Sequence, residues 1–160
     1  MTENDYKQYI NMYSDGVLRY LAKNLQDIDD AKDILQDTFI ALWDNKDKIQ
    51  NGKAKNWLFT TAHNRMLKLI RYRKVRQNTV NIDQEAALVQ SSEKHRYDSL
   101  QQIDVLLQNL SETMKQCLML KEWSGFSIKE IASIMQISEE NVKINIFRAK
   151  IKLRENTQAR

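Results

Sequence analysis

Apolar residues recur at helical spacing along most of the chain, with polar residues between them. Over residues 6–25 the large apolar side chains are three or four positions apart, which predicts one amphipathic helix. The pattern is most regular in a second segment, formed by Ala31, Ile34, Leu35, Thr38, Phe39, Leu42 and Trp43. This spacing predicts a helix with one buried face. We expect Asp29 or Asp30 to cap it, because a carboxylate there accepts hydrogen bonds from free backbone amides.

The periodicity breaks over residues 45–55, where Gly52 and alternating polar residues predict a loop. A third helix is expected from Asn56, and it ends in the charged run 71–76. From about residue 77 to 98 polar residues replace large apolar ones, which is typical of a poorly packed, flexible linker. The predicted fold is therefore all-α, with two small helical domains at residues 1–77 and 100–160 and a linker at residues 78–99.

The second domain contains the strongest local signal in the sequence. Residues 127–130, Ser-Ile-Lys-Glu, have the form of a capping box, which predicts a helix from Ile128. Ser111 and Ser138 are the expected N-caps of the helices before and after it. Two short helices joined by a tight turn predict a helix-turn-helix. Gln136 stands where this turn most often has glycine, so we expect a left-handed conformation that costs about 1–2 kcal/mol.

Composition supports this architecture. The chain has no proline and three glycines among 160 residues, too few turn signals for a β-sandwich or barrel. Cys117, the single cysteine, lies in an apolar run, where we expect it to pack in the core. No apolar stretch approaches the roughly 20 residues of a membrane span. We therefore expect a cytoplasmic protein without membrane insertion.

Charge is segregated along the chain into blocks of opposite sign. Residues 27–47 contain seven acidic residues against Lys32 and Lys46, whereas residues 65–76 contain six basic residues and no acidic one. A second stretch without acidic residues, 141–154, contains five basic ones. Blocks of opposite sign indicate two different partners.

The acidic block places Asp33 and Asp37 one turn apart on the polar side of the second helix, beside Gln36. Paired carboxylates can serve acid–base catalysis, but no His, Ser or Cys lies nearby to complete a catalytic site. Neither His63 nor His95 has metal-ligand spacing with another ligand. We expect no enzymatic activity, metal or cofactor. We interpret Asp33, Gln36 and Asp37 as a docking face for a basic partner. The alternative is a face that is merely solvated.

Both basic blocks are candidates for DNA binding. On the third helix Trp57, Phe59 and His63 precede the cations, and this mixture suits single-stranded or melting DNA; Trp57 itself is expected in the core. The candidates there are Asn64, Arg65, Lys68, Arg71, Arg73 and Lys74. A solvated helix end is the alternative for this set.

The outer side of the last helix has donors for phosphates and base edges. The candidates are Lys143, Asn145, Phe147, Arg148 and Lys150. Asn145 is the best candidate for base recognition, because its amide can pair with adenine.

The arrangement of these segments resembles the extracytoplasmic-function sigma factors, the smallest members of the sigma-seventy family, over nearly the whole chain. Residues 30–39, followed by Leu42 and Trp43, are similar to the family's region-two helix. Residues 56–65, Asn-Trp-Leu-Phe-Thr-Thr-Ala-His-Asn-Arg, are similar to its minus-ten segment, and residues 126–132 and 141–150 to its region four. The chain departs from the family pattern at Ser111, Gln136, Ile144 and Asn145.

The resemblance implies a sigma factor that directs promoter-specific transcription initiation. It implies that Asp33, Gln36 and Asp37 dock on the β′ clamp helices of core RNA polymerase, with the β flap as a further polymerase contact. The third-helix candidates and the preceding loop would recognise and melt the minus-ten element of promoter DNA. The last-helix candidates would recognise the minus-thirty-five element. An anti-sigma factor is a further partner that the resemblance implies.

Two other classes of protein stay open at this point. A stand-alone helix-turn-helix regulator would share the second domain, but it would leave the acidic helix and the aromatic-basic helix unexplained. A helical adaptor without DNA contact would leave both basic helices as coincidence. Binding to core polymerase separates these alternatives from a sigma factor.

Overall fold

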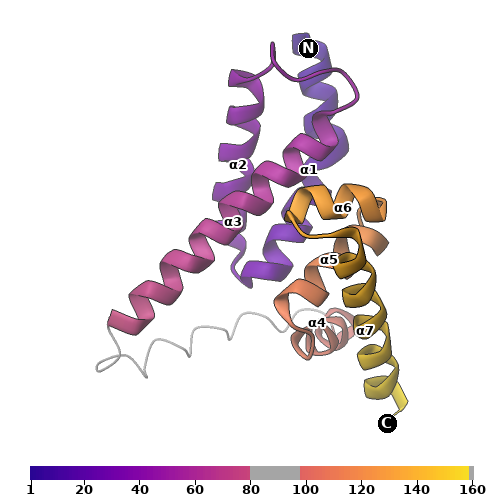
Figure 1. The fold of residues 1–160 in the computed structure, drawn as a ribbon. Coiled ribbons are helices and arrows are strands. Elements are labelled where there is room, and N and C mark those ends of the chain that lie inside the picture. The colour runs from indigo at the N-terminus through magenta and orange to yellow at the C-terminus, as the bar shows by residue number, and fades with distance from the viewer. Residues whose placement is uncertain (80–97, 159–160) are drawn as a thin grey trace.

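The computed structural model describes residues 1–79 and 98–158, and within these ranges it contains helices and turns but no strand. Figure 1 shows the helices in chain order: α1 (Glu3–Leu25), α2 (Ile28–Asp44), α3 (Ala54–Thr79), α4 (Asp98–Gln108), α5 (Glu112–Glu122), α6 (Ile128–Met135) and α7 (Glu139–Gln158). The predicted linker lies outside the described residues, apart from its two ends in α3 and α4. None of the described helices combines the length and the apolar character needed to span a membrane.

The first three helices pack against one another as the N-terminal bundle. Its core is made of the faces that the apolar spacing predicted, with Val17, Leu21, Ala31, Ile34, Leu42, Leu58, Ala62 and Met66 all buried. Tyr20, which that spacing did not select, is buried with them. α1 begins with a capping box between Thr2 and Asp5, which satisfies backbone amides that the helix itself leaves free.

The N-cap of α2 is Asp27, and the expectation of Asp29 or Asp30 was wrong. The Asp27 carboxylate accepts hydrogen bonds from the backbone amides of Asp29 and Asp30, at 3.0 and 3.1 Å. Because α2 already begins at Ile28, the two expected caps lie within its first turn. Their negative charges there interact favourably with the positive end of the helix dipole.

The loop between α2 and α3 covers residues 45–53, so α3 begins at Ala54, two residues earlier than predicted. Ile49 is buried and anchors this loop to the bundle. α3 then continues through the charged run 71–76 as far as Thr79. The cations of that run are therefore distributed around a regular helix.

The last four helices form the C-terminal bundle, in which the predicted caps are confirmed. Ser111 caps α5, and the capping box between Ser127 and Glu130 begins α6. Gln136 ends α6 in the left-handed conformation, with a φ of 55°. The Ser138 hydroxyl then accepts a hydrogen bond from the Asn141 amide at 3.0 Å, at the start of α7. α6 and α7 pack together as the predicted helix-turn-helix.

The two bundles contact each other. α6 lies against α3 near the centre of Figure 1, and α5 lies against α1. Phe59 of α3 meets Phe126, which precedes α6, edge to face with ring centroids 4.9 Å apart. The polymerase and DNA candidates therefore belong to one compact body.

Candidate functional surfaces

The predicted docking residues form one exposed surface on α2, which we call the acidic face: Asp33, Gln36 and Asp37. The opposite side of the same helix is buried through Ile34, Thr38 and Leu42. The fold therefore requires nothing from the acidic face. Its carboxylates remain available to a partner of opposite charge.

An exposed isoleucine extends the acidic face, and the sequence interpretation missed it. Ile40 follows Gln36 by one turn and is 51% exposed. It borders an open hollow of about 440 Å³ between α1 and α2, which Tyr6, Ile10 and Trp43 also line. The sequence did contain a signal for this position, because Ile40 is a β-branched apolar residue among polar positions of the helix. The surface thus combines charge with an apolar recess.

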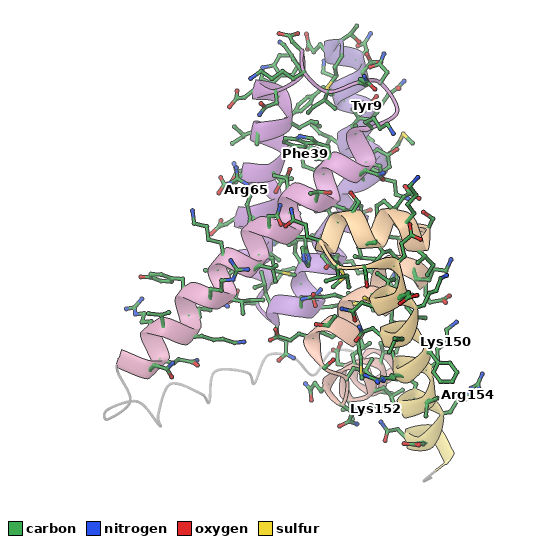
Figure 2. All side chains as sticks on the ribbon, in the orientation of Figure 1. Tyr9, Phe39, Arg65, Lys150, Lys152 and Arg154 are labelled. Atoms are coloured by element: carbon green, nitrogen blue, oxygen red, sulfur yellow. The ribbon has the colours of Figure 1, made fainter. Side chains whose placement is uncertain are left out.

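Five of the six minus-ten candidates on α3 are exposed: Asn64, Arg65, Lys68, Arg71 and Lys74. Asn64, Lys68 and Arg71 follow one another at intervals of four and three residues, so they share one side of the helix. Figure 2 shows Arg65 on the side of α3 away from α7. Arg65 and Lys74 flank that side in opposite directions, so the exposed candidates extend around about half of the helix.

Arg73 does not belong to this surface. It follows Asn64 by nine residues, which at about 100° per residue places it on the opposite side of the helix. Its guanidinium pairs with the carboxylate of Asp30 and lies 4.0 Å from that of Asp27. Arg73 therefore links α3 to the start of α2. The sequence offered no signal for this pairing.

The expected aromatic contribution to the same surface is corrected by the structure. Phe59 and His63 are each 2% exposed. The His63 Nδ1 atom and the Tyr20 hydroxyl are hydrogen-bonded at 2.8 Å, and burial lowers the His63 pKa to about 4. Trp57 is half-buried and packs against the core, in line with its expected place. In this state the rings support the fold and do not face solvent.

On α7 the minus-thirty-five candidates lie outside the buried line of Val142, Ile146 and Ala149. Exposed candidates are Lys143, Phe147, Arg148 and Lys150, of which Phe147 is 66% exposed. Figure 2 shows Lys150 with Lys152 and Arg154 along the outer, C-terminal part of α7. Lys150 lies 3.4 Å from Glu122 of α5 in a half-exposed ion pair.

Asn145 is half-buried, and its amide is partly engaged. Its Nδ2 atom donates to the backbone oxygen of Asn141 at 2.8 Å and to the Asn141 side-chain oxygen at 2.6 Å. The carbonyl oxygen of the Asn145 side chain is left to accept a hydrogen bond. The expected two-point contact with adenine therefore requires the Asn141 contacts to break first.

The exposed side of α7 includes two further residues, which the sequence analysis did not select. Ile144 and Ile151 are both exposed and stand three before and four after Phe147, so the three share one stripe. Their spacing from Phe147 was the available signal. Apolar groups beside cations fit thymine methyl groups beside phosphates.

Other reactive groups are structural. Cys117 is buried with its Sγ atom 3.5 Å from the sulfur of Met135, and burial raises its pKa to about 11. It lies in the core, as expected. Within residues 1–79 and 98–158 no group of three His, Cys, Asp or Glu residues is placed to hold a metal ion.

The chain matches two family models. Residues 9–76 match the model for Sigma-70 region 2, and residues 100–153 match the model for Sigma-70 region 4. The first match contains α2 and most of α3, and the second contains the helix-turn-helix. The two models thus cover the two bundles in the expected order.

Relatives and solved structures agree with these models. The chain is 30% identical over 146 residues to the ECF RNA polymerase sigma factor SigM of Bacillus subtilis, with 89% of each chain covered. It is 28% identical to the RNA polymerase sigma factor YlaC of the same species, over 96% of this chain and 90% of the relative.

Among solved structures, the sigma factor RpoE in complex with the anti-sigma factor NepR from Bartonella quintana superposes with a TM-score of 0.79. It is 26% identical and covers 96% of this chain and 97% of that one. CnrH in complex with the cytosolic domain of CnrY shares the fold with a TM-score of 0.72. The chain therefore belongs to the extracytoplasmic-function sigma factors of the sigma-70 family, which bind core RNA polymerase and direct it to promoters.

Proposed function

We propose that the two bundles divide the work of promoter recognition. Residues 1–77 would bind core polymerase and open the minus-ten element, residues 100–160 would bind the minus-thirty-five element, and residues 78–99 would join them. The observation that supports this division is the separation of two basic helices, α3 and α7, onto two bundles that match regions 2 and 4. The test is promoter-specific transcription by core polymerase with and without the protein.

We propose that the acidic face docks on the β′ clamp helices of core polymerase. Its three residues are exposed and make no contribution to the core of the bundle. Ile40 and the adjoining hollow give the same surface an apolar component, which charge pairs alone lack. Charged interface residues speed association with a partner of opposite charge, and apolar residues add affinity when the interface buries them.

We propose that Asn64, Arg65, Lys68, Arg71 and Lys74 hold the minus-ten element, and that the loop 45–53 assists. Exposed cations at helical spacing can follow a DNA backbone, while Asn64 has an amide for base edges. Arg73 is assigned to bracing α3 against α2, because it is paired with Asp30.

A test of this assignment is Asn64→Ala, which should reduce permanganate reactivity of promoter thymines while holoenzyme assembly stays normal. Arg73→Ala should instead lower the thermal stability of the protein. Unchanged opening in Asn64→Ala at every promoter tested would remove that residue from the site.

We propose that α7 enters the major groove at the minus-thirty-five element, with Lys143, Asn145, Phe147, Arg148 and Lys150 toward DNA. The support is that all five lie outside the buried line of α7: Lys143, Phe147, Arg148 and Lys150 are exposed, and Asn145 is half-buried at its border. A further polymerase contact, with the β flap, is proposed for the C-terminal bundle on the family resemblance alone.

The remaining partners and properties follow from the family. Because RpoE is known in complex with an anti-sigma factor, we propose that this chain also has an anti-sigma partner. It would act in the cytoplasm, where polymerase and promoter meet, and without catalysis of its own. A stand-alone regulator and a DNA-free adaptor are not favoured, since the match to region 2 accounts for the N-terminal bundle.

A further inference from the structure

The outward side of α7 has apolar side chains that the fold does not require. Ile144, Phe147 and Ile151 are each at least 38% exposed. At about 100° per residue, the two isoleucines lie opposite the buried line that contains Val142 and Ile146. We call Ile144, Phe147 and Ile151 the apolar ridge. Its members do not serve the core of the C-terminal bundle.

The burial of α5 shows that the same bundle buries polar groups elsewhere. Residues 115–120 of α5 are all buried, and they include the polar residues Lys115 and Gln116. The bundle therefore encloses a lysine and a glutamine on α5, while two isoleucines and a phenylalanine of α7 stay in solvent. Exposed apolar groups gathered on one side of a helix indicate an interaction surface.

Cations on both flanks of the apolar ridge indicate that its partner is DNA. Lys143 lies about 40° beyond Phe147 on one flank, and Arg148 lies about 40° beyond Ile144 on the other. Both cations are exposed. The major groove has a matching arrangement, because phosphates border it on both sides and base edges form its floor. With the apolar ridge over the floor, each cation faces one border.

Position along α7 distinguishes the two isoleucines. The recognition helix of a helix-turn-helix contacts base edges with its N-terminal residues, and Ile144 is the sixth residue of α7 (Glu139–Gln158). Ile151 follows seven residues later, about 10 Å further along the axis at 1.5 Å per residue. That displacement equals about three base pairs at 3.4 Å each. Ile144 is therefore the isoleucine that reaches base edges.

The base edges of the major groove offer an apolar side chain one partner of its own kind, the 5-methyl group of thymine. Asn145 gains discrimination from such a contact. Its Nδ2 atom donates to Asn141 twice, so its side-chain oxygen is the group that it offers to a base. An acceptor alone does not separate adenine from cytosine, because both present an amino group in the major groove. A methyl contact separates them, because the A·T pair contains the methyl group.

We propose that Ile144 is a specificity-determining residue that recognises the methyl group of a thymine in the minus-thirty-five element, with Phe147 beside it. Together with the Asn145 side-chain oxygen, it selects A·T base pairs where the first turns of α7 reach the groove. This proposal rests on the proposed function of α7 and adds which base pair the helix prefers. Ile144 and Asn145 both depart from the family pattern, so the preference is a property of this chain.

The test removes the methyl group from the DNA and the apolar side chain from the protein, separately and together. The full-length protein is bound to core polymerase, and its preferred minus-thirty-five element is obtained from a library of randomised upstream elements. Each thymine of that element is then replaced in turn by deoxyuridine, which lacks only the 5-methyl group. The affinity of each holoenzyme for the promoter duplex is measured.

The variants are Ile144→Ala and the matched control Ile151→Ala, which removes the same side chain from the same exposed side of α7. At one thymine, deoxyuridine should weaken binding of the wild-type holoenzyme about fourfold, the effect of leaving one methyl group unburied. In Ile144→Ala the same replacement should have no measurable effect, because the side chain that contacts the methyl group is gone. Ile151→Ala should retain the full fourfold effect.

A deoxyuridine effect that persisted in Ile144→Ala would overturn the proposal, and so would a preferred element in which every thymine tolerated deoxyuridine. A preferred element without thymine, or an effect lost equally in Ile151→Ala, would also contradict it. The proposed function of α7 fails differently. Replacement of the whole upstream element by an unrelated sequence would then leave the affinity of the wild-type holoenzyme unchanged.

Discussion

α3 and α7 are both rich in cations and both contain aromatic residues, yet they present different surfaces. On α3, Phe59 and His63 are buried and Arg73 is held in an ion pair. The helix is also partly covered by α6. α7 exposes its cations together with Phe147. An aromatic-basic helix therefore does not reveal by itself which of its residues are available to DNA. The neighbouring helices decide this.

The largest expected effect concerns polymerase docking, a function assigned to the N-terminal bundle alone. Asp33→Lys/Asp37→Lys should weaken core polymerase binding by about 3 kcal/mol, roughly a hundredfold, because the two exposed carboxylates are lost and the lysines in their place repel the basic partner. A pull-down titration measures it. The control Asp15→Lys/Asp47→Lys makes the same charge change at exposed residues elsewhere in the bundle. Equal binding by test and control variants would reject the docking assignment.

The next effect concerns the inward side of α3. His63 has a folded-state pKa of about 4 against an ordinary 6.5, so the unfolded chain takes up its proton first as the pH falls. The stabilisation is complete above pH 6.5 and is lost as the pH falls toward 4, by up to about 3 kcal/mol. Urea unfolding at pH 7 and 4.5 measures it.

In His63→Gln the decrease in stability between these two pH values should be smaller. An unchanged decrease would show that other groups cause the acid sensitivity.

On α7 the expected effect is smaller and specific to sequence. Asn145→Ala should flatten the preference at one position of the minus-thirty-five element, at a cost of about 1–2 kcal/mol for the preferred base. Asn141→Ala should alter the same position, since Asn141 holds the Asn145 amide. Transcription from a library of randomised upstream elements measures both. A preferred sequence that survived Asn145→Ala would end its proposed role in base recognition.

The smallest effect distinguishes a phosphate contact from a base contact on the same helix. Lys143→Ala should weaken binding about equally for all sequences and lower the slope of log affinity against log salt by about one. Lys121→Ala, at an exposed lysine of α5, is the control. A slope that did not change would place Lys143 away from the DNA backbone.

Local signals predicted the helices well, because their causes lie within a few residues. The capping box at Ser127 and the left-handed Gln136 depend on neighbours in sequence and were both expected. The wrong cap of α2 arose where three aspartates compete within four residues, and Asp27 is the one directly before the helix. Competition of this kind between neighbouring aspartates shifts the start of the predicted helix by a few residues but does not change the prediction that a helix forms.

Long-range contacts explain what the sequence could not predict about the surfaces. Phe59 is buried by Phe126 and packs beside Tyr20, residues that are distant in the chain. Arg73 reaches Asp30 across two helices. No periodicity within α3 indicates either partner. The position of a cation on a helix was predictable, but its availability required knowledge of what lies opposite.

The complete burial of residues 115–120 in α5 has a consequence for tolerance to substitution. Surface helices accept changes on one side and reject them on the other, which leaves a periodic record in a mutational scan. α5 should reject changes at every position of this stretch, Lys115 and Gln116 included, although its composition is that of a half-exposed helix. Natural variation in this segment is then limited by both bundles together, so they cannot diverge independently there.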